Sequence, residues 1–142
     1  MVTPSLWLWP RAAARLGIPV LETPPSGVDT TEAGGAATLD GIWVNSHEPN
    51  PVCAAVHELA HVLLGHCAFL GGPVTSDLFH AAEAEAELVA LRVCQRIGQT
   101  DAQLNESVIY IAIMLRYAGS PLNSSEKLEL VAKIILNAGL PA

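Results

Sequence analysis

The side chains best suited to chemistry are His57, Glu58 and His61, which form the pattern His-Glu-x-x-His. Residues four apart on an α-helix lie on one face, one turn apart, so both imidazoles can bind a single metal ion. Zinc binds imidazole nitrogen at about 2.0–2.1 Å and lowers the pKa of a water molecule that it binds toward about 7. Glu58 lies on the adjoining face and can accept the proton of that water. The spacing therefore predicts two zinc ligands and a general base for hydrolysis of a carbonyl compound.

A catalytic zinc usually has a third protein ligand and one open position, so a further ligand is needed downstream. The extended pattern HExxHxxGxxH does not supply it, because Leu64 and Cys67 occupy the positions of its glycine and its third histidine. Gly65 and His66 are each displaced by one residue. We expect Gly65 to end the helix and His66 simply to follow it.

The acidic run Glu83-Ala84-Glu85-Ala86-Glu87 provides better candidates. Glu83 is predicted to be the third zinc ligand, on a second helix that faces the first. Glu87 lies one turn further on the same face and is expected to accept a hydrogen bond from a ligand imidazole, which would fix the tautomer of that ring. Glu85 points about 200° away from Glu83 and is expected to be solvated. The alternative interpretation of this run is a solvated acidic helix face without a metal.

Several other side chains are weaker candidates. His80, one turn before the acidic run, is either a rival ligand or proton donor, or a histidine at the end of a loop with no role. Tyr110 is a candidate for stabilising an oxyanion, although the apolar residues around it predict a core helix. Cys53 either lies beside the metal or is a small buried apolar residue. The pair Trp7 and Trp9 is interpreted as packing or as an exposed patch for a partner.

The two helices that must carry the site have clear boundaries in the sequence. The first is predicted from Pro51 to about Leu64, with Asn50 as its N-cap and Pro51 at its first helical position. The second is predicted from Ser76, as its cap, to Ile97, with Gly98 ending it. An amphipathic helix with a surface histidine pair is the competing interpretation of the first.

The remaining elements predict an α+β domain, with a small N-terminal sheet and four or five helices in a single domain over residues 1–142. The prediction comprises a short helix over 10–16, a short strand over 18–22, a loop over 23–36, a strand over 38–45 with a bulge or turn at 40–41, a loop over 66–75, a helix over about 106–117, and a last helix that ends near 139 with Asn123 and Glu126 as a capping box.

Composition sets limits on the class of protein. The chain has 142 residues, of which 51% are hydrophobic and 15% charged, and this excludes an intrinsically disordered chain. Its longest strongly apolar run, 108–115, is too short to span a bilayer. The three cysteines form no CxxC pair, which suits a reducing compartment. We therefore expect a cytoplasmic protein with no membrane association.

Charge is distributed unevenly along the chain. The net charge is −7, and the stretch 16–91 contains no lysine or arginine. Nucleic-acid binders need basic side chains for phosphate contacts, so direct binding to nucleic acid is not expected. The acidity either serves only to keep the domain soluble or attracts basic partners.

The segments HELAHVLLGH and HAAEAEAELVALRVCQRIG, with the preceding GIWVN, resemble the zincin-like metallopeptidase domains of the ImmA/IrrE type. They also resemble the related C-terminal domain of ArdC antirestriction proteins. The resemblance covers roughly residues 37–98 and implies zinc ligation by His57, His61 and Glu83, with Glu58 as general base. The chain departs from the pattern at Glu87, where ImmA-like proteins often have asparagine. Within these 142 residues we expect neither the large N-terminal single-strand-binding domain of ArdC-like proteins nor a helix-turn-helix companion.

These observations together predict a gluzincin-like zinc metallopeptidase, and the resemblance implies that it is regulatory and of narrow specificity. Its substrate is predicted to be a protein or peptide, such as a basic DNA-binding regulator. The alternatives are a non-catalytic zinc-binding interaction module and an acidic factor of the antirestriction type that acts by charge mimicry. Glu58 distinguishes the metallopeptidase from the interaction module, because a purely structural zinc site needs no general base.

Overall fold

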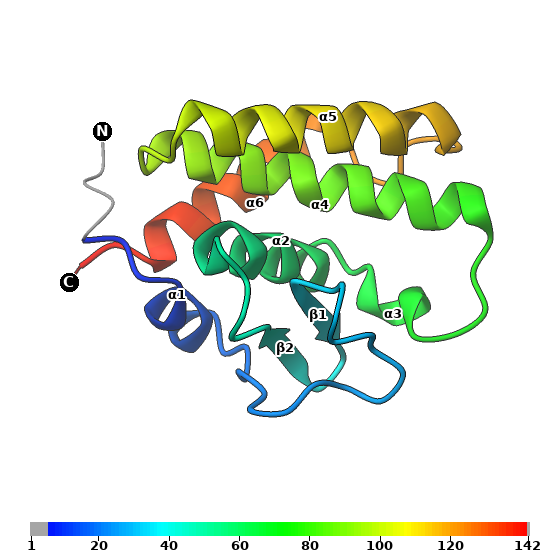
Figure 1. The fold of residues 1–142 in the computed structure, drawn as a ribbon. Helices are drawn as coiled ribbons and strands as arrows, with labels where there is room; N and C mark the ends of the chain where they lie inside the picture. Colours follow the sequence, from blue (N-terminus) through cyan, green and yellow to red (C-terminus); the bar gives the residue numbers. More distant parts are fainter. Residues whose placement is uncertain (1–5, 142) are drawn as a thin grey trace.

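The computed structural model describes residues 6–141 and has the predicted α+β class (Figure 1). Within these residues it contains six helices and one two-stranded antiparallel sheet. The elements are α1 (Trp9–Arg15), β1 (Gly35–Thr38), β2 (Gly41–Val44), α2 (Pro51–Leu63), α3 (Cys67–Leu70), α4 (Ser76–Arg96), α5 (Asp101–Tyr117) and α6 (Ser125–Ala138). The one-turn helix α3 lies in a segment that was predicted to be a loop.

Helix α2 begins and ends as predicted. The Asn50 side chain accepts a hydrogen bond from the Cys53 amide at 3.2 Å, and Pro51 occupies the first turn. At the other end Gly65 has a φ of +79°, which suits glycine. The His66 amide donates to the His61 carbonyl at 3.0 Å and the Gly65 amide donates to the Val62 carbonyl at 3.1 Å. This is a Schellman ending, and it turns the chain so that His66 returns to the last turn of α2.

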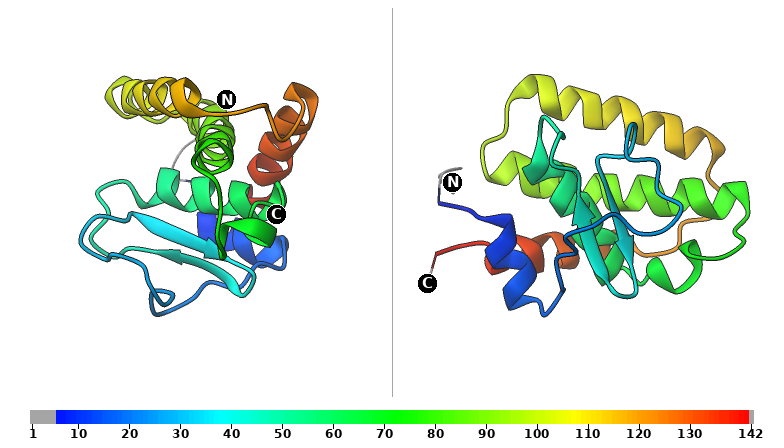
Figure 2. Two further views of the ribbon diagram at one scale, coloured as in Figure 1. Left: turned by 90° about the vertical axis from the view of Figure 1, so that its right-hand side faces the viewer. Right: turned by 60° about the horizontal axis from the view of Figure 1, so that its bottom comes forward.

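Helix α4 is the centre of the fold. It packs against α2 on one side and against α5 and α6 on the others, and α2 in turn separates it from the sheet (Figure 2). Small side chains allow this close packing on several faces. The buried alanines of α4 are Ala81, Ala82, Ala84, Ala86 and Ala90. The middle of the helix therefore has little solvated surface, and Glu85 faces protein rather than water.

The N-terminal sheet differs from the prediction in its strand boundaries. Strands β1 and β2 form a hairpin in which Gly35 pairs with Val44 and Thr38 pairs with Gly41. The predicted strand over 38–45 is shorter than expected and covers only 41–44. Of the bulge or turn predicted at 40–41, the structure has a turn, at residues 39–40, where the chain reverses direction. The predicted strand over 18–22 is reduced to one parallel bridge between Val20 and Ile42. The carbonyl of Pro19 lies where a Cβ of Gly41 would be, so this junction leaves no room for a side chain.

The two C-terminal helices are present as predicted, but the N-terminal cap of each differs from the prediction. Helix α5 starts earlier than expected, because Thr100 and Gln103 form a capping box. The cap of α6 is Ser124, which accepts from the Lys127 amide, and not Asn123 as predicted. No helix within residues 6–141 is long and apolar enough to cross a membrane.

The two ends of the described chain lie together at one side of the molecule. Trp7 is 2% exposed, and its indole nitrogen donates to the Leu136 carbonyl at 2.9 Å. The Leu8 amide donates to the Gly139 carbonyl at 3.1 Å. Of the two interpretations of the tryptophans, packing therefore holds for Trp7, and Trp9 is partly buried against the same core.

Candidate metal centre

Helices α2 and α4 bring His57, His61 and Glu83 together. Their nearest ligand atoms all lie within 4.8 Å of one another. The Nε2 atoms of the two histidines are 3.1 Å apart. The carboxylate of Glu83 reaches both of them, with Oε2 at 2.5 Å from His61 Nε2 and Oε1 at 3.5 Å from His57 Nε2. Two nitrogens and one carboxylate thus converge on one point between the helices.

The donor set fits zinc. Ligands at about 2.1 Å from a tetrahedral ion are about 3.4 Å from one another, and the three separations in this cluster bracket that value. Both histidines present Nε2 to the shared point, and their Nδ1 atoms are engaged elsewhere. An imidazole whose Nδ1 carries the hydrogen leaves the Nε2 lone pair free for a metal. These two imidazoles and one carboxylate form a triad that could hold a metal ion.

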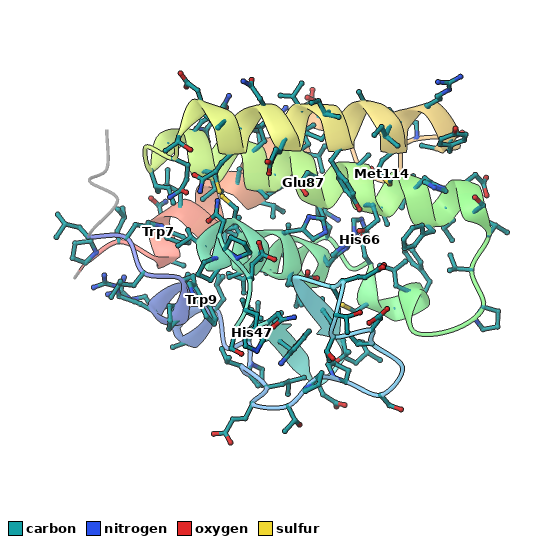
Figure 3. All side chains as sticks on the ribbon, viewed as in Figure 1. Trp7, Trp9, His47, His66, Glu87 and Met114 are labelled. Carbon is teal, nitrogen blue, oxygen red and sulfur yellow. The ribbon has the colours of Figure 1, made fainter. Side chains whose placement is uncertain are left out.

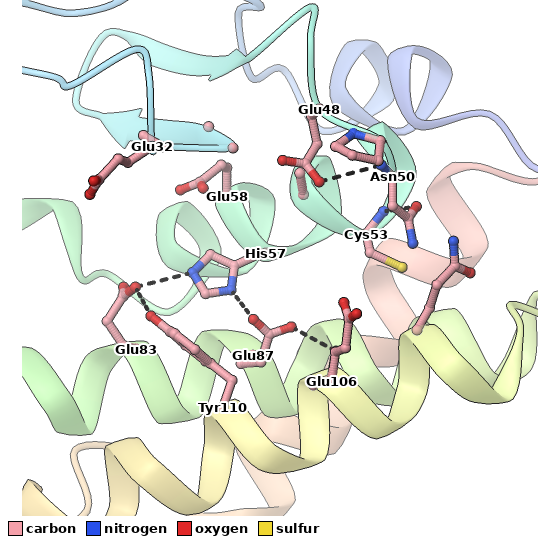
Figure 4. A pocket seen from close by; sticks show the side chains of 17 residues that line it. Glu32, Glu48, Asn50, Cys53, His57, Glu58, Glu83, Glu87, Glu106 and Tyr110 are labelled. Atoms are coloured by element: carbon pink, nitrogen blue, oxygen red, sulfur yellow. Dashed lines mark hydrogen bonds and ion pairs between the residues drawn. The ribbon is translucent and has the colours of Figure 1, made fainter.

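Glu87 contacts His57 at Nδ1, the ring nitrogen that faces away from the triad. Its Oε2 lies 3.1 Å from His57 Nδ1, and its Oε1 accepts from the Ser107 hydroxyl at 3.1 Å (Figure 4). The structure thus places Glu87 in contact with a candidate ligand imidazole. Glu83 and Glu87 are one turn apart on α4, so that they contact opposite nitrogens of the same ring.

Tyr110 comes from α5 and reaches the same cluster. Its hydroxyl donates to Glu83 Oε1 at 2.9 Å. Burial and the neighbouring negative charge of Glu83 raise the pKa of Tyr110 well above its ordinary value, so the phenol remains a hydrogen-bond donor at neutral pH. Tyr110 therefore lies where it can donate to an oxygen atom in the cleft.

Glu58 lies on α2 beside the first histidine, and its side chain lies along strand β1. A Cβ on Gly35 would come within 3.0 Å of Glu58 Cγ, so the glycine makes room for the glutamate. The residue is only 8% exposed, yet it lines the cleft (Figure 4). Burial raises the pKa of Glu58 to about 7; the charge of His57 opposes this, and those of Glu83 and Glu87 add to it. A carboxylate with such a pKa is suited to exchanging protons near neutrality.

The charges of the ligands are tightly coupled. Burial lowers the pKa of His61 to about 4, although Glu83 opposes this. Burial would also lower the pKa of His57, but hydrogen bonds to Glu83 and Glu87 raise it well above its usual value. Glu83 has a pKa below its usual range, because its hydrogen bonds to both histidines outweigh the effect of burial. Without a metal, the cluster therefore holds an ionised carboxylate against a protonated His57.

The cluster opens into a cleft of about 720 Å³. This is the size of an ordinary ligand-binding pocket. Its lining includes His57, Glu58, Glu83, Glu87 and Tyr110, together with the further carboxylates of Glu32, Glu48 and Glu106. No lysine or arginine is among the residues that line it. The cleft is therefore strongly acidic around the candidate metal position.

Two of the weaker candidates lie apart from the triad. His80 bonds to the Ser76 carbonyl of its own helix and has the Tyr117 ring 5.5 Å away, and the metal-ligand cluster does not include it. The interpretation of His80 as a ligand is not supported by this position. Cys53 lines the cleft but does not belong to the cluster either, and it lies against Cys94, which lowers its pKa.

Two residues that the sequence analysis set aside are at the centre of the structure. Glu85 is 7% exposed, so the prediction that it is solvated is wrong. The physical reason is that α4 is covered on several sides, and the face that carries Glu85 meets the segment before α6. His66 lies in the interior of the molecule and is 1% exposed (Figure 3). Its Nδ1 contacts His61, and its Nε2 contacts Glu85. His66 thus does more than follow the helix end.

Comparisons of the chain with protein-family models, with curated proteins and with solved structures found no match. The assignment of chemistry to this site therefore depends on the residues and their geometry.

Proposed function

We propose that this protein is a zinc-dependent peptidase with a zincin-like arrangement of its two central helices. The observation that carries the proposal is the position of Glu58, whose carboxylate faces the same cleft as the open side of the triad. A site that only stabilised the fold would need neither a buried acid of this kind nor a cleft beside it. The resemblance of HELAH and EAEAE to ImmA/IrrE-type domains supports the same proposal.

The chain's own residues account for the steps of peptide hydrolysis. His57, His61 and Glu83 would hold a zinc ion, which supplies Lewis-acid activation of water and of the scissile carbonyl. Glu58 accepts the proton of the attacking water and can return it to the leaving amine. Tyr110, whose hydroxyl points into the cleft, donates a hydrogen bond to negative charge that develops on the substrate oxygen. Glu87 keeps the His57 ring in place during these steps.

The acidic lining supports a basic polypeptide as substrate. Glu32, Glu48 and Glu106 lie around the triad without a basic neighbour in the cleft. They would repel the phosphates of a nucleic acid and attract lysine and arginine side chains of a peptide. A basic segment of a DNA-binding regulator meets this requirement.

The decisive experiment compares the wild-type protein with Glu58→Gln at matched zinc content, using a lysine-rich and arginine-rich peptide library as substrate. Glutamine keeps the size and can hydrogen-bond to water but cannot accept its proton. We expect Glu58→Gln to retain zinc and fold and to lose about 10²–10⁴-fold in kcat. Glu22→Gln, an exposed glutamate outside the cleft, is the matched control and should be fully active. Equal rates for wild type and Glu58→Gln would refute the peptidase; a zinc-loaded wild type without any hydrolysis would favour the interaction module.

A further inference from the structure

Behind the second histidine of the triad lies a buried pair of ionisable side chains that the proposed reaction does not use. His66 is 1% exposed and Glu85 is 7% exposed. They come from different places in the fold: His66 from the turn after α2, and Glu85 from the middle of α4. Burying such groups costs free energy unless they are hydrogen-bonded, so both side chains need partners inside the fold.

The contacts form one continuous chain of hydrogen bonds. His61 Nδ1 lies 2.9 Å from His66 Nδ1, and His66 Nε2 lies 3.1 Å from Glu85 Oε1. Glu85 in turn accepts from the Leu122 and Asn123 amides, both at 2.9 Å, and from the Asn123 side chain at 2.8 Å. This series of hydrogen bonds therefore connects the triad to the segment that leads into α6.

The direction of each hydrogen bond follows from the groups at the far end. Three N–H donors point at Glu85, so its carboxylate can only accept, and His66 must donate to it from Nε2. A neutral His66 that carries its hydrogen on Nε2 has an acceptor at Nδ1. His61 then donates from Nδ1, and its Nε2 lone pair is left facing His57 and Glu83. In this arrangement three of the four ring nitrogens have hydrogen-bond partners, and the fourth, His61 Nε2, carries no hydrogen and is free to accept a metal ion.

The backbone explains why the two rings meet. In a Schellman ending the residue after the glycine contacts the third residue from the helix end, usually through two apolar side chains. Here those two positions are His66 and His61, with Gly65 between them in the left-handed conformation. The fold has therefore placed a hydrogen-bonded pair of imidazoles where a hydrophobic contact is the rule.

We propose that His66 and Glu85 are positioning residues that hold the His61 ring through its Nδ1, so that Nε2 is aimed at the metal. The proposal rests on the proposed function to the extent that it assigns a metal to the triad. It does not depend on hydrolysis. The second histidine is thus held by the neighbouring imidazole and its carboxylate, whereas the first is held by Glu87 directly.

The test uses zinc affinity, measured by competition with a chromophoric chelator, and the visible spectrum of the cobalt-substituted protein. The variants are His66→Leu, His66→Asn and His66→Gln in the full chain. The asparagine oxygen can occupy the place of the histidine Nδ1 and accept from His61, whereas the glutamine amide reaches toward the place of Nε2. Loss of such a partner typically weakens metal binding about 10–100-fold.

We expect His66→Leu and His66→Gln to bind zinc about 10–100-fold more weakly than wild type, and His66→Asn to recover most of the loss. The cobalt spectrum should shift in the first two variants and be close to wild type in His66→Asn. Phe69→Leu, which alters the ring that packs near His66 but not its hydrogen bonds, is the control for disturbed packing and should bind zinc normally. If His66→Leu does not fold, the zinc affinities of His66→Asn and His66→Gln still test the proposal.

Equal zinc affinity in the asparagine and glutamine variants, or an affinity of His66→Leu equal to wild type, would overturn the proposal. A wild-type chain that binds no zinc would overturn it together with the proposed function. A wild type that binds zinc and hydrolyses no peptide would overturn the proposed function alone, because the affinity comparison would still decide the role of His66 and Glu85.

Discussion

Oε2 of Glu87 lies 3.1 Å from Nδ1 of His57, one turn along α4 from the carboxylate that contacts the other nitrogen of that ring. The ring is therefore held between two carboxylates of one helix, and its orientation follows from the helical repeat. We expect Glu87→Ala to weaken zinc binding about 10–100-fold without loss of fold. Glu87→Gln, whose amide oxygen can still accept from Nδ1, should lose less. Chelator competition measures both; an alanine variant with wild-type affinity would contradict this role.

The ligand set itself can be tested by elemental analysis. His57→Ala and Glu83→Ala each remove one of the three converging groups and should leave the purified protein with little zinc. His80→Ala is the matched control, because His80 lies on the same helix as Glu83 but outside the cluster. It should retain one zinc per chain. Full zinc content in Glu83→Ala would show that another group completes the site.

The raised pKa of Glu58 predicts how stability depends on pH in the metal-free protein. Its ordinary value is 4.5 and its value in the fold is about 7, so the folded state binds this proton more tightly than the unfolded state. The stabilisation is present below pH 4.5 and is lost as pH rises through about 7. The loss is on the order of 3 kcal/mol. Glu58→Gln cannot lose a proton, so its free energy of unfolding relative to wild type should increase with pH.

Urea unfolding of metal-free wild type and Glu58→Gln at about pH 5 and about pH 8 measures this difference. Zinc adds a positive charge beside Glu58 and favours its ionised form, so the difference between the two pH values should become smaller when zinc is bound. A difference that is independent of pH would mean that Glu58 is not held in a desolvated site.

The acidic cleft predicts a preference for basic peptides. A cleavable peptide with lysine beside the scissile bond should have a higher kcat/KM than the same peptide with glutamate, and the advantage should decrease with added salt. Glu106→Gln removes one of the cleft carboxylates and should reduce kcat/KM for the lysine peptide about 2–5-fold. Equal kcat/KM values for the lysine and glutamate peptides at low salt would contradict selection by charge.

Local sequence signals were sufficient for the helix that carries the histidines. Asn50, Pro51 and Gly65 mark its ends through capping chemistry that does not depend on the rest of the fold. The four-residue spacing then requires both imidazoles to share a face. The same reasoning placed Glu83 and Glu87 on one face of α4, and the structure turns that face toward α2.

Glu85 shows where this reasoning fails. The helical repeat gives the direction of a side chain but not what lies in that direction, and α4 has protein on several sides. One signal was present, because alanines occur all around this helix and a helix with small apolar residues on every side belongs in the interior. For His66 the signal was the predicted glycine ending of α2, which implies contact between His66 and His61.

Helix α5 provides Ser107 and Tyr110 to the cleft, yet none of its residues is buried. Elements with little buried surface separate from a fold at a lower free-energy cost than elements of the core. The three candidate metal ligands, in contrast, lie on α2 and α4, which contribute many residues to the apolar core. The cleft therefore combines two core helices, α2 and α4, with one helix, α5, that has no buried residue. We therefore expect α5 to separate from the cleft more readily than α2 and α4, with the spacing of His57, His61 and Glu83 unchanged.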